Sequence, residues 1–369
     1  MKKVVIIGGG FGGLACAHVL RGCPSLQVTL LDLKPSCDFL PLLPDIVGGR
    51  ISADAARVPL ASWATDEGFV FIHDEVTRVD RDQRRVYARK EVYEYDYLVI
   101  AAGTQTNFYG NTTFANLALK LDDVTDAERI VSAVEKTPFD TVVVAGGGYT
   151  GVEIATNLRR RLDQLHRTQR IVIIETAGEV VPVLPEWMKQ YVKNNLAHLN
   201  VEVLANCRVQ TAQDARVVLS NGSTFESALL IWSAGVQTPA FVRDLGATQT
   251  PQGRLAVDEF LQISEGVFSI GDTAAVTFDG RPLRMAVQFS LAQGWATGEN
   301  LLRHQRGESF RRYRPSDLGY IVPMSNFRGC GEVLGKRVHG WPAAFLHYAM
   351  SVFRSVGNRQ RIRILKDLL

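Results

Sequence analysis

The sequence predicts an α/β fold in which one structural plan occurs twice. An apolar run, a glycine-rich turn and a second apolar run that ends in a carboxylate occupy residues 4–32 and again residues 142–175. Each turn has the spacing G-x-G-x-x-G, and the closing acids are Asp32 and Glu175. Near the end of the chain a basic segment places its apolar residues at helical spacing. We therefore expect two similar α/β domains and a C-terminal amphipathic helical segment.

Each glycine-rich turn predicts a site for a dinucleotide. Glycine lets the turn tighten and lets the backbone approach a pyrophosphate, and the N-terminus of the following helix presents N–H groups to it. The acid that closes the second strand can accept hydrogen bonds from ribose hydroxyls. One such motif is weak evidence, but two copies in strand–turn–helix–strand context indicate two Rossmann-like domains. A chain that holds two dinucleotides is expected to pass electrons between them.

The order of apolar runs predicts how the domains divide the chain. Residues 1–112 and 256–325 are expected to form the first domain, residues 113–255 the second, and residues 326–369 the C-terminal segment. A long helix is expected over residues 285–304. The remaining strands are expected in both domains at residues 69–72, 85–88, 97–100, 201–204, 215–219 and 229–232.

Composition excludes several classes of protein. The 369 residues suit two or three domains, and 46% hydrophobic with 21% charged residues is typical of a globular chain. The five cysteines are odd in number and scattered, which argues against a secreted disulfide framework and for a reducing compartment. Neither a CxxC motif nor a Cys/His cluster offers a metal site, and no apolar run is long enough to span a bilayer.

The basic C-terminal segment predicts an anionic membrane surface as partner. Residues 311–369 contain eleven Lys/Arg and three Asp/Glu, a balance of +8, so that the rest of the chain carries −5 of the net +3. A basic amphipathic helix within residues 341–369 can lie in a membrane interface. Docking of this helix against the protein itself, or against a second copy in a homodimer, is the alternative, and no nucleic-acid motif is present. The apolar face is expected to hold Leu346, Ala349, Met350, Phe353 and Val356, and the polar face His347, Ser351, Arg354 and Ser355.

Three further motifs resemble those of the flavoproteins with two dinucleotide-binding domains. Residues 101–104 (A-A-G-T) resemble the turn that closes the family's first domain, and residues 231–236 (I-W-S-A-G-V) resemble its W-A-A-G-V turn. Residues 268–272 (F-S-I-G-D) resemble the family's second FAD motif, whose Asp bonds the ribityl chain. The resemblance implies FAD on the first fingerprint and NADH or NADPH on the second.

Within that superfamily the chain most resembles type II NADH dehydrogenases. The segments that carry this resemblance are residues 39–49, 148–153, 182–185, 288–294 and 340–345. The resemblance implies a non-proton-pumping enzyme that passes a hydride from NADH to FAD and then two electrons to a membrane quinone. It also implies a peripheral membrane protein, on the cytoplasmic face of a bacterial plasma membrane or on an organelle membrane. The sequence departs from the family at Pro44, where many members have an aromatic residue, and at Ala292, where the quinone segment has its second Gln.

The resemblance and the motifs together predict the site residues. Glu153, on the first turn of the second helix, is expected to position NADH or relay a proton, or else simply to favour the helix N-terminus. Gln288 is expected to bond a quinone or the flavin edge, or to meet solvent. His347 is expected either to protonate reduced quinone or to mark a polar helix face. The predicted cofactor-binding residues are Gly8, Gly10, Phe11, Gly12, Gly13, Asp32, Lys34, Val76, Ala102, Gly103, Gly146, Gly148, Tyr149, Thr150, Gly151, Glu175, Gly235, Gly271 and Asp272.

The acid of the second fingerprint predicts which nicotinamide nucleotide binds. A carboxylate at Glu175 accepts from a ribose 2′-hydroxyl and repels a 2′-phosphate, which favours NADH over NADPH. Two alternatives to the quinone enzyme stay open. One is an NADH oxidase, peroxidase or sulfide:quinone-type thiol enzyme that uses Cys37 or Cys330. The other is a redox-sensing flavoprotein similar to apoptosis-inducing factor.

Overall fold

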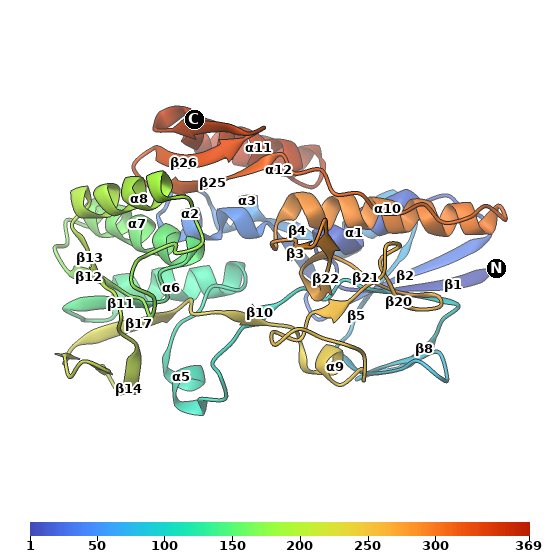
Figure 1. Ribbon diagram of the computed structural model, residues 1–369, viewed down its shortest axis with the longest axis horizontal. Coiled ribbons are helices and arrows are strands. Elements are labelled where there is room, and N and C mark those ends of the chain that lie inside the picture. Colours follow the sequence, from blue (N-terminus) through green and yellow to red (C-terminus); the bar gives the residue numbers. More distant parts are fainter. The chain divides into compact units, whose positions relative to one another are not determined.

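The computed structural model describes all residues 1–369 and divides them into two compact units (Figure 1). The first unit contains residues 1–37, 58–105 and 236–317, and the second contains residues 38–57, 106–235 and 318–369. These boundaries differ from those predicted, because residues 38–57 and the C-terminal segment join the second unit and residues 236–255 the first. The order of motifs along the chain does not reveal such exchanges, which depend on contacts between distant segments.

A parallel sheet forms the centre of the first unit. Its strand order is β20-β21-β9-β1-β2-β5, and only β20 runs antiparallel to its neighbour. The apolar residues 4–7 of β1 and all four residues of β9 are buried, as expected for a sheet with both faces covered. The strands are β1 (Lys2–Ile7), β2 (Leu26–Asp32), β5 (Val70–His73), β9 (Tyr97–Ile100), β20 (Gln262–Ser264) and β21 (Val267–Ser269).

Two helices pack closely beside the glycine turn of the first unit. They are α1 (Phe11–Leu20) and α10 (Val287–Gln305). A Cβ at Gly294 would lie 2.2 Å from the carbonyl oxygen of Gly12, so only glycine allows this approach. The unit also contains α4 (Leu60–Glu67), α9 (Ala240–Arg243) and an antiparallel sheet of β6 (Val76–Asp80), β7 (Arg85–Ala88) and β8 (Val92–Glu94).

The second unit repeats the plan with a four-stranded parallel sheet. Its order β13-β12-β11-β17 corresponds to the order β5-β2-β1-β9 in the first unit, which confirms the predicted α/β repeat. The strands are β11 (Thr141–Ala145), β12 (Arg170–Ile174), β13 (Val201–Leu204) and β17 (Ala228–Trp232). The helices and the flanking antiparallel sheet are α6 (Val124–Lys136), α7 (Tyr149–Gln164), α8 (Glu186–His198), β14 (Val209–Gln213), β15 (Arg216–Leu219) and β16 (Thr224–Phe225).

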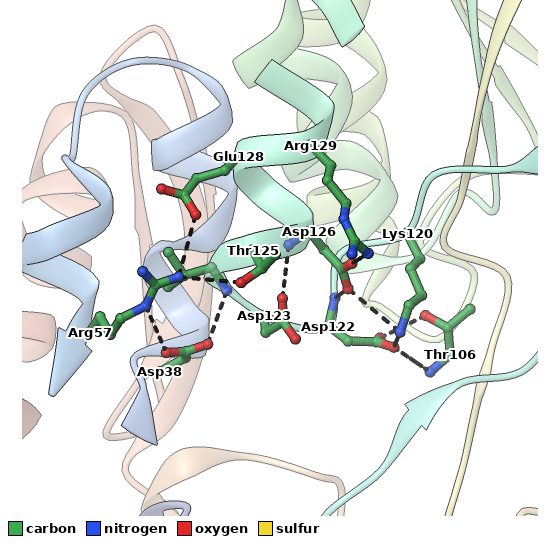
Figure 2. Close-up of polar contacts among 11 residues, drawn as sticks. Asp38, Arg57, Thr106, Lys120, Asp122, Asp123, Thr125, Asp126, Glu128 and Arg129 are labelled. Atoms are coloured by element: carbon green, nitrogen blue, oxygen red, sulfur yellow. Dashed lines mark hydrogen bonds and ion pairs between the residues drawn. The ribbon is translucent and has the colours of Figure 1, made fainter. Parts of the chain in front are cut away.

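A network of charged side chains fixes α6 within the second unit (Figure 2). Asp38 accepts a hydrogen bond from the backbone N–H of Val124 at 3.1 Å, at the first residue of the helix. Arg57 pairs with Asp38 at 3.8 Å and with Glu128 at 3.4 Å. Asp123 caps the helix by accepting from the N–H of Asp126 at 2.8 Å. The network therefore ties residues 38–57 to the second unit.

The C-terminal segment of the second unit is a small sheet followed by two helices. It contains β25 (Gly319–Met324), β26 (Arg328–Val333), β27 (Lys336–His339), α11 (Trp341–Arg354) and α12 (Gly357–Leu368). Two short helices from the first part of the chain, α2 (Leu43–Val47) and α3 (Ala53–Ala56), belong to the same unit. The chain contains no helix that is both long enough and apolar enough to span a bilayer.

Helix α11 is amphipathic as predicted, but its faces are rotated from those expected. The exposed stripe holds Trp341, Phe345 and Phe353, whose side chains are 70%, 60% and 72% accessible. Ser351 and Ser355, predicted on an exposed polar face, are buried, and that prediction is wrong. Their hydroxyls bond the backbone carbonyls of the same helix, which satisfies them without solvent.

The remaining elements are short. They are β3 (Ser36–Asp38), β4 (Arg57–Pro59), β10 (Gln105–Thr106), α5 (Thr112–Leu117), β18 (Val236–Gln237), β19 (Leu255–Ala256), β22 (Ala274–Ala275), β23 (Thr277–Phe278), β24 (Arg281–Pro282) and the 3-10 turns Leu40–Leu42 and Gly271–Thr273.

Candidate nucleotide-binding sites and a buried acid cluster

Each of the three fingerprint glycines of the first unit is required for a different structural reason. Gly8 has a φ of +108°, and a Cβ there would lie 2.2 Å from the carbonyl oxygen of Ala101. A Cβ at Gly13 would lie 1.9 Å from the carbonyl oxygen of Gly8. At Gly10, by contrast, a Cβ would meet no atom within 4 Å. The first and third glycines therefore allow tight packing, and the second leaves the backbone open to a ligand.

The predicted ribose acid lies against the same turn. Asp32 accepts from the N–H of Gly9 at 2.5 Å and from the N–H of Lys34 at 2.7 Å. The N-cap residue of α1 is Gly10, which has no side chain to cap the helix, and the first N–H groups of an α-helix have no partner within the helix itself. This arrangement fits a pyrophosphate and an adenosine ribose, as the second unit's turn also does.

The second unit has the same arrangement of glycines and closing acid. Gly146 has a φ of +111° beside the carbonyl of Ser233, and a Cβ at Gly151 would lie 1.9 Å from the carbonyl oxygen of Gly146. Gly148 is open, and α7 begins after it without a side-chain cap. Glu175 accepts from the N–H of Gly147 at 2.7 Å and of Ala177 at 2.8 Å. The second cradle is therefore also built for a dinucleotide.

A third part of the first cradle is the turn at Gly271 and Asp272. The N–H of Gly271 donates to the side-chain oxygen of Gln293 at 2.6 Å, and Gln293 is buried. Arg254 donates to the backbone carbonyl of Asp272 at 3.1 Å. The carboxylate of Asp272 makes no hydrogen bond within the chain, and burial raises its pKa. It is thus free to bond hydroxyl groups of a cofactor, while Gln293 holds the turn in place.

Other predicted cofactor-binding residues lie around these two turns. Phe11 and Gly12 begin α1, and Tyr149 and Thr150 begin α7. A Cβ at Gly235 would lie 2.3 Å from the Tyr109 hydroxyl. Ala102 and Gly103 lie in the turn after β9, and Val76 begins β6 and packs against the apolar core of the first unit. Their contacts with cofactors stay predictions.

Glu153 lies at the second unit's turn with an unusual protonation state. It is on the first turns of α7, half-buried, and its carboxyl makes no hydrogen bond within the chain. Burial, together with the charge of Asp45, raises the pKa of Glu153 to about 8. The side chain is therefore protonated at neutral pH and able to donate a proton.

The other two predicted catalytic residues have different surroundings. Gln288, at the start of α10, donates its amide to Asp317 at 3.1 Å, and Arg284 pairs with the same carboxylate. Burial and the charge of Arg354 lower the pKa of His347 to about 4. The imidazole is therefore neutral at pH 7 and holds no proton to give to reduced quinone, because desolvation and the nearby Arg354 charge both oppose its protonation.

Sequence reasoning missed a buried cluster around Asp45. Asp45 and Arg50 are 3% and 8% accessible, and the Tyr348 hydroxyl donates to Asp45 at 2.7 Å. Arg50 donates to the carbonyl of Ser325 at 2.5 Å, and its guanidinium lies 4.2 Å from the Phe327 ring centre. The available signal was an acid and an arginine inside the mostly apolar stretch 39–51.

The thiols give little support to the cysteine-based alternatives. All five cysteines are free. Burial raises the pKa of Cys330 to about 12, and the pKa of Cys16 likewise, so these thiols are not thiolates at neutral pH. Cys37 is 5% accessible, which limits its access to a substrate.

Comparison with known proteins points in one direction. The chain is 25% identical over 374 residues to the type II NADH:quinone oxidoreductase of Staphylococcus aureus, covering 94% of this chain and 93% of that protein. The corresponding protein of Staphylococcus haemolyticus is 24% identical over the same shares.

Solved structures show the same fold. The structure of NDH2 from Plasmodium falciparum in complex with NADH matches with a TM-score of 0.88 at 17% identity, covering 100% of this chain and 97% of that one. The sulfide:quinone oxidoreductase of Aquifex aeolicus matches with a TM-score of 0.79 at 21% identity, covering 96% and 90%. The family model of the pyridine nucleotide-disulphide oxidoreductases matches residues 2–294. With both glycine cradles present, this chain belongs to the pyridine nucleotide-disulphide oxidoreductase family.

Proposed function

We propose that this protein oxidises NADH through bound FAD and reduces a membrane quinone, in the balanced reaction NADH + H⁺ + quinone → NAD⁺ + quinol. The observation that carries the proposal is the pair of complete dinucleotide cradles, one in each unit, each closed by an acid bonded to its glycine turn. The similarity to type II NADH:quinone oxidoreductases over 94% of the chain supports the acceptor.

The first unit would hold FAD, which when bound accepts a hydride and gives up electrons in pairs or singly. Gly10 and the N–H groups of α1 would bind the pyrophosphate, Asp32 the adenosine ribose and Asp272 the ribityl hydroxyls. A Cβ at Gly10 would meet no atom within 4 Å, α1 begins without a side-chain cap, and the Asp272 carboxylate makes no hydrogen bond within the chain.

The second unit would select and orient NADH. Glu175 would accept from the 2′-hydroxyl of the adenosine ribose and exclude a 2′-phosphate by charge. Glu153, protonated at neutral pH, would hold the proton that the reaction consumes. Gln288 is the proposed polar contact for the acceptor, steadied by Asp317.

The exposed face of α11 supports attachment to a membrane surface. Trp341, Phe345 and Phe353 form an apolar stripe, and α12 adds Ile362 and Leu365, which are 54% and 45% accessible. The cations Arg359, Arg361, Arg363 and Lys366 on α12 complement anionic lipids. We propose a peripheral membrane protein that meets its quinone at the cytoplasmic surface of a bacterial plasma membrane.

Anaerobic flavin absorbance tests the proposal. NADH is expected to bleach the flavin and a short-chain quinone to restore its colour rapidly, whereas NADPH bleaches it poorly. Glu175→Gln should reduce the preference for NADH over NADPH in flavin reduction by about tenfold or more, since a charged hydrogen bond contributes about 1.5–3 kcal/mol. Glu202→Gln, an exposed acid paired with Arg170 on the same sheet, is the control. Bleaching by NADH without reoxidation by any quinone would rule out the proposed acceptor.

A further inference from the structure

Asp45 and Glu153 lie on two helices of the second unit that are held tightly together. Arg161 of α7 donates to the carbonyl oxygens of Ile46 and Val47 on α2, at 3.1 and 2.9 Å. Gly48 follows α2 at a point where a Cβ would lie 2.2 Å from the side-chain oxygen of Asn157. The position of α2 against α7 is therefore fixed by hydrogen bonds and by close packing.

The surroundings of Asp45 stabilise its ionised form against burial. The Tyr348 hydroxyl donates to it at 2.7 Å, the Arg50 guanidinium lies 3.7 Å away, and Arg160 on α7 adds a second positive charge. Burial raises the pKa of Asp45 to about 6, and these three groups oppose that rise. At pH 7 Asp45 is therefore mostly a carboxylate.

The surroundings of Glu153 are the reverse. Its carboxyl makes no hydrogen bond within the chain, and no cation acts on it. The charge of Asp45 raises the pKa of Glu153, and burial, which has the larger effect, raises it too. The two acids thus differ in partners: Asp45 has a hydroxyl and two guanidinium groups, and Glu153 has only the negative charge of Asp45. Burial and the charge of Asp45 therefore both favour the protonated form of Glu153, whereas the three partners of Asp45 favour its ionised form.

We propose that Asp45 is a positioning residue that keeps Glu153 protonated through its negative charge, so that Glu153 is a proton donor at the nicotinamide site. This inference rests on the proposed function, in which each NADH oxidised consumes one proton. The proton leaves the Glu153 oxygen for the reduced acceptor, and the resulting carboxylate, beside an ionised Asp45, readily takes up a proton from water. Tyr348, Arg50 and Arg160 act on Glu153 indirectly, because they stabilise the ionised form of Asp45.

Carbon-13 NMR of the holoenzyme, labelled at glutamate side-chain carboxyls, tests the inference directly. Glu153→Gln identifies the Glu153 signal as the one that disappears, and the unmodified enzyme should titrate it near pH 8. Asp45→Asn keeps an acceptor for the Tyr348 hydroxyl but removes the charge, and should lower the midpoint by about one pH unit or more. Asp126→Asn is the matched control, since Asp126 is also a buried acid of this unit but lies on α6. It should leave the midpoint unchanged.

A second variant and a kinetic readout complete the test. Asp45→Ser also removes the charge, offers a hydroxyl to Tyr348, and serves if the amide variant fails to fold, while Asp45→Glu should restore the original midpoint. In stopped-flow reoxidation of the reduced flavin by a short-chain quinone, which is the half-reaction that consumes the proton, the alkaline limb of the rate–pH profile should move to lower pH in the uncharged variants. An unchanged Glu153 midpoint in both would overturn the inference. Failure of the unmodified enzyme to reduce any quinone would contradict the proposed function and leave the carboxyl titration standing.

Discussion

Single atoms decide which fingerprint glycines serve the fold and which serve the ligand. A Cβ at Gly13 would lie 1.9 Å from a backbone oxygen, whereas a Cβ at Gly10 would meet open space. The same contrast separates Gly151 from Gly148 in the second unit. Because a backbone oxygen cannot move aside as a flexible side chain can, the two kinds of glycine should respond differently to the same added methyl group.

Alanine substitutions in the first turn should separate stability from cofactor binding. Gly13→Ala should destabilise the protein by about 1–3 kcal/mol or more through overpacking, and lower flavin content as a consequence. Gly10→Ala should leave the unfolding of the flavin-free protein nearly unchanged, yet reduce flavin content because the methyl group occupies the side open to the pyrophosphate. Calorimetry of the flavin-free protein and the flavin-to-protein absorbance ratio measure the two effects. Equal loss of stability in both variants would contradict the distinction.

The imidazole of His347 should make stability depend on pH. Its pKa is lowered to about 4 in the folded chain, while an unfolded histidine titrates near 6.5. As pH falls below 6.5 the unfolded chain binds a proton that the folded chain refuses, so this contribution to stability is lost progressively down to about pH 4. The free energy of unfolding measured with urea should therefore fall less steeply between pH 7 and pH 4.5 in His347→Gln than in the unmodified protein. His198→Gln, at an exposed position on α8, should keep the original slope, and a parallel fall in all three proteins would contradict the prediction.

Elements that depend on local pattern could be predicted, and those that depend on distant partners could not. The strands β1, β2, β11 and β12 and both glycine turns follow from a short run of residues, and the structure has them where the sequence indicates. The face of α11 could not be predicted so well, since Ser351 and Ser355 are buried with their hydroxyls bonded inside the helix. Spacing shows that a helix is amphipathic, but only its partners decide which residues face outward.

The role of Asp45 was hidden for the same reason. Tyr348 is about three hundred positions further along the chain, and the pair is visible only after folding brings α11 and α2 together. Arg50 likewise finds its partners in Ser325 and Phe327. In the sequence alone, an acid next to Pro44 is typical of the end of a helix. Its hydrogen bond with Tyr348, its contact with Arg50 and the charge of Arg160 make it part of a site.

Helix α11 should attach the protein to anionic membranes through its exposed stripe. Replacing Phe345 and Phe353 together by Glu should weaken binding to phosphatidylglycerol vesicles at least tenfold, because burying one such ring contributes about 1.5–3 kcal/mol. Vesicle co-sedimentation measures binding, and activity with a soluble short-chain quinone should persist. Val92→Glu, at an exposed position on β8, is the control and should bind as the unmodified protein does. Undiminished vesicle binding by the double variant would contradict attachment through α11.

The whole molecule is divided so that neither unit is one continuous stretch of chain. The second unit contains residues 38–57, 106–235 and 318–369, and the C-terminal stretch supplies part of its core. Val322, Cys330 and Tyr348 are among its buried residues. The C-terminal segment is therefore both a candidate membrane anchor and a structural part of the unit that would hold NADH.

Two truncations should separate these roles. A chain that ends at residue 317 loses the sheet of β25, β26 and β27 together with α11, and so uncovers Asp45 and Arg50 from Tyr348 and Phe327. It should lose NADH binding and unfold at lower temperature, yet keep flavin, because the first unit contains no residue beyond 317. A chain that ends at residue 355 lacks only α12, keeps Tyr348, and should bind both cofactors while binding vesicles more weakly. Calorimetry, flavin content and NADH titration distinguish the outcomes. Normal NADH binding by the shorter chain would show that the C-terminal segment is an appendage and not part of the second unit's core.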